Sequence, residues 1–112
     1  MAYSKAILMR ELKGNGFTFN LENISADEKN IGCMGTITNP KNGVMVSVNT
    51  VKLPLVENKM LFRFVGKDGY YKGENNHFAS RKDFAKEIID ALNHPERAKE
   101  EDQLLGNKLP SL

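Results

Sequence analysis

Cationic and aromatic side chains are interspersed in one segment of this 112-residue chain, from Arg63 to Lys82. Single-stranded nucleic acid requires this mixture, because cations follow the phosphates while aromatic faces stack on the bases. The predicted nucleic-acid-binding residues are Arg63, Lys67, Tyr71, Lys72, Arg81 and Lys82. The same mixture is also typical of an ordinary sheet face whose lysines only keep a protein in solution.

Charge is distributed unevenly along the chain. The formal net charge is only +2, but nine basic residues stand against four acidic ones between Lys41 and Lys86. The stretch from Glu96 to Asp102 is instead acidic, with four acids and two bases. Positive charge is therefore concentrated in the middle of the sequence, where the predicted binding segment lies.

Residues that could support catalysis or hold a metal are few and far apart. Cys33 is the only cysteine, and the two histidines, His77 and His94, are separated by a predicted helix, so a zinc site is not expected. Cys33 is interpreted as a small buried side chain of a strand, although the sequence leaves a pairing with His77 open. No nucleophile and base have a recognisable spacing. We therefore predict no catalytic residue, no metal site and no cofactor.

Composition indicates one globular domain. The chain is 40% apolar and 27% charged, and a chain of 112 residues can bury a sufficient core without a disulfide or a metal. A single cysteine fits a reducing compartment. The apolar run from Ala6 to Met9 is too short for a signal peptide or a membrane span. A cytoplasmic location without membrane contact is therefore expected.

Short alternations of apolar and polar residues, separated by glycine turns, predict an antiparallel sheet. Asn39–Gly43 is the clearest turn, because proline and Asn-Gly supply the backbone angles that a turn needs. Tyr3–Leu12 is ambiguous between a strand and a helical turn, and we interpret it as a strand. The other predicted strands are 17–22, 31–38, 44–48 with a continuation from 51 to 55, 60–65 and 70–72.

The predicted strand at 44–48 and its continuation from 51 to 55 have apolar residues at positions of different parity, which indicates a bend. The valines of residues 44–48 occupy even positions, whereas Val51, Leu53 and Leu55 occupy odd ones. A shift of one residue near Asn49-Thr50 is what a β-bulge produces, and such bends let a sheet curl.

One strong helix is predicted from Ser80, where Ser80 and Asp83 fit a capping box. His94-Pro95 ends it, since the residue before a proline is pushed out of the helical region. A second, mostly polar helix is predicted from Pro95 to Leu105. Residues 1–92 are thus predicted to form a single α+β domain, and residues 93–112 a polar C-terminal helix and tail.

The fold class expected for residues 1–92 is a small antiparallel, strongly bent sheet, or an open pseudobarrel, closed by a C-terminal helix. The alternative is a flat α+β sandwich with the helix on one face.

The segments Gly43–Val48 and Met60–Gly66, within a β-rich body that precedes a terminal helix, resemble the PrgU family. These are small PUA-like proteins encoded on pheromone-responsive conjugative plasmids of Gram-positive bacteria. The resemblance covers residues 1–92 in size and order of elements. It implies a PUA-like pseudobarrel, a cytoplasmic location, and a role in dampening expression of transfer genes by binding RNA. No functional residue is transferred from the family, because no motif aligns residue by residue.

The sequence therefore predicts a small non-catalytic regulatory protein that binds nucleic acid, with RNA as the expected partner. The alternative is a protein-binding adaptor or inhibitor without nucleic-acid activity. It would use a sheet edge near Pro54 or the acidic tail helix, and it could form a homodimer. A small-molecule-binding barrel is a third hypothesis, and an enzyme is the last.

Overall fold

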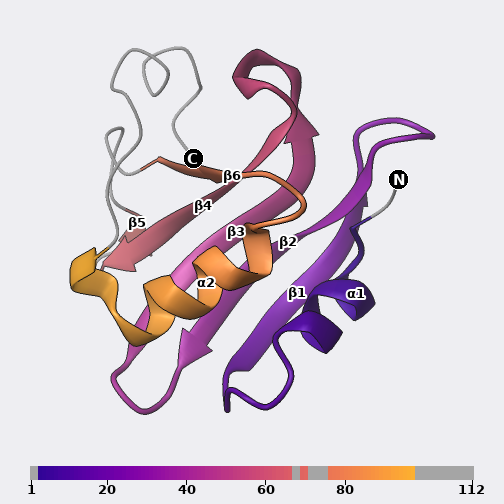
Figure 1. Ribbon diagram of the computed structural model, residues 1–112. Helices are drawn as coiled ribbons and strands as arrows, with labels where there is room; N and C mark the ends of the chain where they lie inside the picture. Colours follow the sequence, from indigo (N-terminus) through magenta and orange to yellow (C-terminus); the bar gives the residue numbers. More distant parts are fainter. Residues whose placement is uncertain (1–2, 67–68, 71–75, 98–112) are drawn as a thin grey trace.

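Antiparallel strands form a single open layer in the computed structural model, which describes residues 3–66, 69–70 and 76–97 (Figure 1). Strands β1 to β4 are neighbours in chain order, β6 pairs with the far side of β4, and the short β5 pairs with the end of β4. The predicted antiparallel α+β architecture is confirmed, and the described strands do not close into a barrel. The strand bounds are β1 Thr18–Ser25, β2 Ile31–Asn39, β3 Val44–Leu53, β4 Lys59–Gly66, β5 Gly69–Tyr70 and β6 His77–Ala79.

Strand register separates the sheet into an apolar face and a polar face. One row across β1 to β4 consists of Phe19, Ile37, Val46 and Phe64, each directly opposite the next. The neighbouring row consists of Asn20, Thr36, Ser47 and Arg63. Because successive side chains in a strand point to opposite faces, the first row lies on the core face and the second on the outer face.

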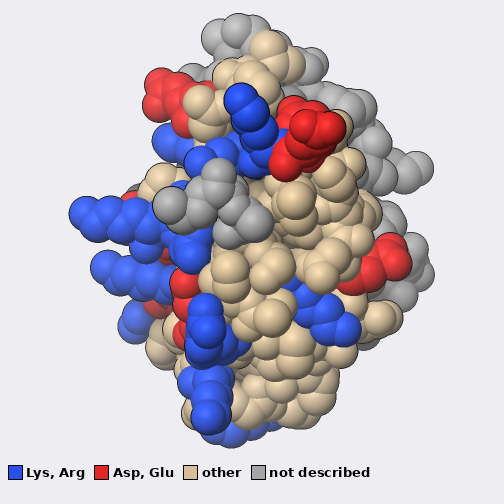
Figure 2. All heavy atoms as spheres, turned by 90° about the vertical axis from the view of Figure 1, so that its right-hand side faces the viewer, with Lys and Arg blue, Asp and Glu red and all other residues tan. Residues whose placement is uncertain are grey.

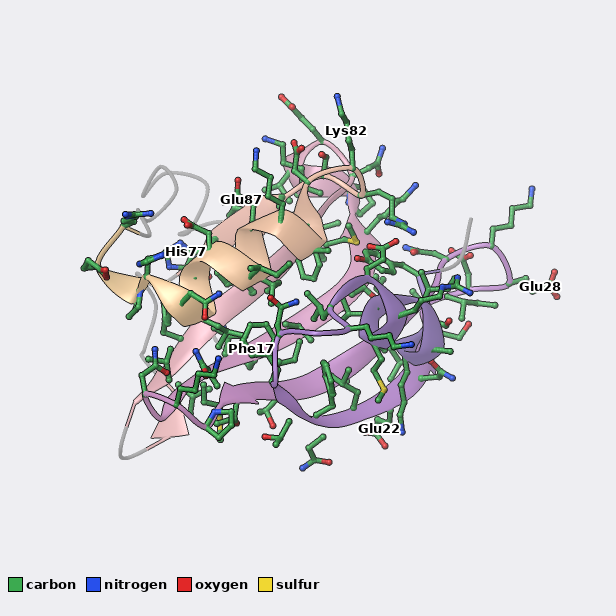
Figure 3. All side chains as sticks on the ribbon, turned by 60° about the horizontal axis from the view of Figure 1, so that its bottom comes forward. Phe17, Glu22, Glu28, His77, Lys82 and Glu87 are labelled. Atoms are coloured by element: carbon green, nitrogen blue, oxygen red, sulfur yellow. The ribbon has the colours of Figure 1, made fainter. Side chains whose placement is uncertain are left out.

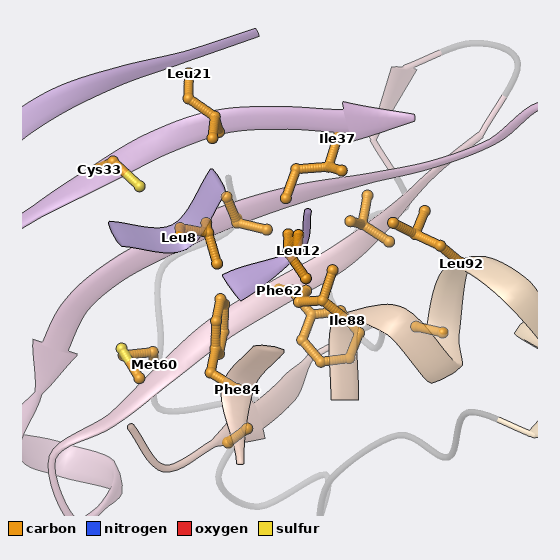
Figure 4. Packing of buried hydrophobic residues seen from close by; sticks show 14 of the residues in the cluster. Leu8, Leu12, Leu21, Cys33, Ile37, Met60, Phe62, Phe84, Ile88 and Leu92 are labelled. Atoms are coloured by element: carbon orange, nitrogen blue, oxygen red, sulfur yellow. The ribbon is translucent and has the colours of Figure 1, made fainter. Parts of the chain in front are cut away.

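Both helices lie on the core face (Figure 1). Helix α1 spans Lys5–Glu11 and α2 spans Phe84–Asn93. Leu8 and Leu12 from the first helical segment meet Phe84, Ile88 and Leu92 of α2 over the strands, and all five are buried (Figure 4). Each such side chain contributes roughly 1.5–3 kcal/mol when it is removed from water. This shared core fixes where the two helices lie relative to each other.

The interpretation of Tyr3–Leu12 as a strand is wrong, because residues Lys5–Glu11 form α1. Ser4 caps this helix, since its Oγ accepts a hydrogen bond from the Ile7 amide at 3.3 Å. Leu8 and Leu12 are four residues apart and therefore point to the same side, into the core. In the sequence, this four-residue spacing is hard to recognise, because residues 6 to 9 are all apolar.

The predicted turn at Asn39–Gly43 is confirmed, and it also holds the end of α2. The amide groups of Asn39 and Asn42 both donate to the Leu92 carbonyl oxygen, at 3.0 Å and 2.9 Å. Carbonyl groups in the last turn of a helix lack partners within the helix, so these two amides supply them. The turn between β2 and β3 thereby fixes the end of α2. The last helical residue is Asn93, directly before His94 and Pro95.

The predicted bulge is also confirmed, since the register between β3 and β4 shifts between Asn49 and Leu53. At this point the Thr50 hydroxyl turns inward. Its Oγ1 accepts from the Cys33 amide at 2.8 Å and donates to the Tyr3 carbonyl oxygen at 2.7 Å. The bulge therefore fastens the segment before α1 to the sheet. Cys33 is buried, as predicted, and burial raises the pKa of its thiol.

Four other elements differ from the sequence predictions or extend them. Helix α2 begins at Phe84 rather than at Ser80, whose hydroxyl contacts the Asp83 carboxylate at 3.3 Å instead of an amide. Strand β6 has only three residues and was not predicted. Two short 3-10 turns span Pro54–Val56 and Pro95–Arg97. The remainder of the predicted second helix lies outside the described residues.

Gly35→Ala should destabilise the protein by about 3 kcal/mol, because the new methyl group would overlap the Asn20 carbonyl oxygen of β1 and the backbone φ is +140°. Gly43→Ala should cost only about 1 kcal/mol, since φ is +76° there but no atom lies within 4 Å of the added methyl group. Urea unfolding of both variants measures the difference. Equal losses at the two positions would contradict the close packing of β1 on β2.

Candidate nucleic-acid interface

The structure does not bring the three described members of the predicted binding set, Arg63, Arg81 and Lys82, onto one surface. Lys67, Tyr71 and Lys72 lie outside the described residues. Arg63 is in β4, whereas Arg81 and Lys82 are in the connection between β6 and α2. Each of the three described cations has a different environment.

Arg63 is not a surface cation. Its side chain lies on the outer face of β4, opposite Ser47, and the residue is only 1% exposed. Its Nε donates to Asn76 Oδ1 at 2.8 Å, and burial lowers the pKa of the guanidinium group. The prediction that Arg63 contacts phosphate from an exposed strand is therefore not supported by its position.

His77 and Phe78 of the same segment are also packed inside. His77 stacks on Phe62 with ring centres 5.0 Å apart and meets Phe64 edge-on at 5.3 Å. Phe78 points to the opposite face of β6, where it packs with Leu61 in a second, smaller apolar cluster. These rings stabilise the sheet, and they do not form an exposed surface for stacking bases.

Arg81 joins the two helical segments. Its guanidinium group lies 3.7 Å from the centre of the Tyr3 ring and 3.0 Å from a carboxylate oxygen of Glu11, at the end of α1. Tyr3 donates its hydroxyl to the other Glu11 oxygen at 2.6 Å. A cation over an aromatic face and a charge-assisted hydrogen bond are both stabilising, so the three groups hold α1 against the start of α2.

The pKa values of Tyr3 and Glu11 follow from the contacts of these two residues with each other and with Arg81. Burial, together with the hydrogen bond to Glu11, raises the pKa of Tyr3. Partial burial alone would raise the pKa of Glu11, but the hydrogen bonds from Tyr3 and Arg81 outweigh it and lower that pKa below its usual range. Glu11 is therefore ionised at neutral pH, and it neutralises Arg81.

Three further cations surround this ion pair and are exposed: Arg10, Lys82 and Lys86. Arg10 is next to Glu11 in the chain, while Lys82 and Lys86 line a shallow groove of about 710 Å³ together with Glu11. Within the described residues, none of the three cations has an acidic group at ion-pair distance. We call Arg10, Arg81, Lys82 and Lys86 the helix-edge cluster.

Figures 2 and 3 show the side of the molecule to which Lys82 belongs. Lys and Arg side chains gather along the left border of Figure 2, the side on which the helices lie, with acidic side chains among them. Lys82 and Glu87 point away from the sheet on the helix side, whereas Glu22 extends from the opposite side (Figure 3). The helix-edge cluster is therefore accessible from the side that carries both helices.

At the end of the groove where α2 ends, the basic side chains lie close to acidic ones. Arg97 lies 3.8 Å from Asp90, and His94 lies 3.6 Å from Glu96. Among the described residues that line the groove, the charged side chains without an ion-pair partner are Lys82, Lys86 and Glu87, all at the end where α2 begins. Exposed ion pairs of this kind contribute little to stability.

Metal binding has no support in the part of the chain that is described, since no three His, Cys, Asp or Glu side chains are grouped there to hold an ion. The described helices are also too short and too polar to cross a bilayer.

No family model, no curated protein and no solved structure matches this chain. The functional interpretation therefore depends on the chemistry of the surface itself.

Glu11→Gln should reduce the free energy of unfolding by about 1 kcal/mol at about pH 7, because Arg81 loses its counter-charge. The pKa of Glu11 is lowered in the folded state, so its stabilisation is complete above the ordinary value of 4.5 and is lost as the pH falls through the lower folded value. Urea unfolding of wild type and variant at about pH 7 and about pH 3 should therefore show a smaller difference at the lower pH.

Glu87→Gln is the matched control, since Glu87 is exposed on α2 and makes no ion pair within the described residues. It should change stability by less than about 0.5 kcal/mol at both pH values. A pH-independent effect of Glu11→Gln would argue against the ion pair.

Proposed function

We propose that this protein is a non-catalytic regulator that binds nucleic acid, RNA in particular, through the helix-edge cluster. The observation that carries the proposal is the group of Arg10, Lys82 and Lys86 around an ion pair that already neutralises Arg81. Phosphate groups are the most abundant ligands that such a group of lysine and arginine side chains can attract.

The proposed recognition is directed at the phosphate backbone rather than at the bases. His77 and Phe78 are buried, so neither ring offers an exposed face on which bases could stack. The cations of the helix-edge cluster can contact successive phosphates of a duplex or of a folded RNA strand. Such contacts fix the position of the protein on the nucleic acid without reading the base sequence. Structured RNA therefore fits this surface better than an unstructured single strand.

The finer parts of the sequence interpretation remain part of this proposal. A PUA-like pseudobarrel, a cytoplasmic location and a role in dampening expression of conjugative transfer genes all come from the resemblance to the PrgU family. They are consistent with a protein that acts by occupying RNA. Binding in that case would be sufficient for regulation, and no catalytic step is required of the chain.

Lys82→Glu combined with Lys86→Glu should weaken binding to a folded RNA hairpin by about tenfold or more at about 50 mM salt. Removing two phosphate contacts should also reduce the slope of log affinity against log salt by about 2. Fluorescence anisotropy between about 50 and 200 mM salt measures both quantities, with duplex DNA and unstructured RNA as competitors.

The matched control is Lys29→Glu combined with Lys41→Glu, which makes the same change in net charge at two exposed positions outside the cluster. It should leave most of the affinity intact. A third variant, Lys67→Glu with Lys72→Glu, tests the predicted residues that lie outside the described part of the chain. Absence of saturable binding by the wild type would refute the proposed function, whereas loss only in the third variant would refute the helix-edge site alone.

A further inference from the structure

Asparagine followed by glycine occurs twice in the chain, as Asn15-Gly16 after α1 and as Asn42-Gly43 in the turn between β2 and β3. Both pairs lie at the same end of the sheet, because the start of β1 is paired with the end of β2 (Figure 1). Such a pair is chemically labile, since the glycine nitrogen can attack the asparagine side chain without hindrance from a side chain of its own. The chain therefore presents one reactive sequence in two different surroundings.

Hydrogen bonds hold all three reacting groups of Asn42-Gly43. Asn42 Nδ2 donates to the Leu92 carbonyl oxygen at 2.9 Å, and Asn42 Oδ1 accepts from the Val44 amide at 3.0 Å. The Gly43 amide donates to the Asn39 carbonyl oxygen at 2.8 Å. The attacking nitrogen, the leaving group and the side-chain carbonyl oxygen are thus all engaged, so a reaction at Asn42 requires three hydrogen bonds to break.

The Asn15-Gly16 pair is held by fewer contacts. Asn15 Nδ2 donates to the Leu12 carbonyl oxygen at 2.9 Å, with a longer contact of 3.5 Å to that of Lys13. Within the described chain, Asn15 Oδ1 accepts no hydrogen bond and the Gly16 amide donates none. Gly14 and Gly16, on either side, have φ angles of +89° and +77°, and no atom lies within 4 Å of a methyl group added at either. The backbone around Asn15 therefore has room to rotate the Gly16 nitrogen toward the side chain.

We propose that Asn15 is a site of spontaneous deamidation in the folded protein and that the fold protects Asn42. In this reaction the Gly16 nitrogen forms a bond to Asn15 Cγ, while the bond from Cγ to Nδ2 breaks. The proton of the Gly16 amide passes to Nδ2, which leaves as ammonia. Water then opens the cyclic imide at one of its two carbonyl carbons and gives aspartate or isoaspartate. Water is the only co-reactant, and the reaction is independent of nucleic-acid binding.

Solvent exposure alone would predict the opposite order of reactivity. Asn42 is exposed, whereas Asn15 is half-buried. The proposed order therefore depends on the hydrogen bonds of the turn between β2 and β3, and it is a property of this fold rather than of the Asn-Gly sequence.

Deamidation of Asn15 would weaken the end of α1. The amide that donates to the Leu12 carbonyl oxygen becomes a carboxylate, which cannot donate, and negative charge is unfavourable at the C-terminal end of a helix. Leu12 directly follows Glu11, whose carboxylate binds Arg81. The modification would therefore act beside the contact that holds α1 against the start of α2.

Peptide mapping by mass spectrometry, on protein kept in mildly alkaline buffer, measures deamidation at each asparagine over time. In the folded protein, Asn15 should react about tenfold faster than Asn42 or more, because two further hydrogen bonds must break at Asn42. In urea-unfolded protein the two rates should become similar, since glycine follows both residues. Methylation by a protein isoaspartyl methyltransferase gives an independent readout of the isoaspartate product.

Asn15→Gln is the matched control, because glutamine keeps an amide donor but cyclises far more slowly, and it should remove most of the early reaction of the folded protein. Asn15→Asp reproduces one product and should accelerate amide exchange in α1 by about threefold or more. Unchanged exchange would overturn the proposed effect on α1.

The deamidation site itself has a separate set of contradicting results. Equal rates at the two asparagines of the folded protein, a faster reaction at Asn42, or a ratio that persists unchanged in urea would overturn the assignment. The absence of reaction at both residues, over a period that converts the unfolded chain, would overturn it as well.

Discussion

The contact of Arg81 with Tyr3 and Glu11 determines how the helix side of the molecule is built. It connects Tyr3 and Glu11, which lie before and at the end of α1, with Arg81 before the start of α2, 70 residues beyond Glu11 in the chain. Thr50 and Asn39 secure the same elements to the sheet, at the bulge and at the end of α2. With Arg81 neutralised by Glu11, the charge that remains available for a partner belongs to Arg10, Lys82 and Lys86. The interaction that orders the helices thus also defines the candidate binding surface.

Much of the sheet could be predicted because strand alternation is a local property. The period of two in Phe17–Leu21 and in Val44–Val48, the Asn-Gly turn and the parity shift at Asn49-Thr50 all correspond to observed features. The interpretation of α1 as a strand is wrong, although Ser4 is a capping residue and the lysine, alanine, isoleucine, leucine, methionine and arginine that follow it are mostly good helix formers. β6 was missed because three residues carry too little period to be recognised.

The candidate site was harder to predict, for a physical reason. Alternation shows that Arg63 and Phe64 point to opposite faces, but it does not show that the outer face is buried where β4 meets β6. Arg81 and Lys82 were identified from composition. Composition does not indicate Arg10, because its nearness to Lys82 and Lys86 depends on α1 being a helix whose end, Glu11, meets Arg81. Tertiary contacts between distant segments decide which cations are exposed.

The most direct measurement is a titration of isotope-labelled protein with a folded RNA hairpin, followed by amide chemical shifts in NMR spectra. The account predicts that the largest changes occur at Arg10 and from Arg81 to Lys86, while Thr36 and Ser47 on the outer face change little. Changes centred on the outer face, or none at an RNA concentration that saturates anisotropy, would contradict binding through the helix-edge cluster.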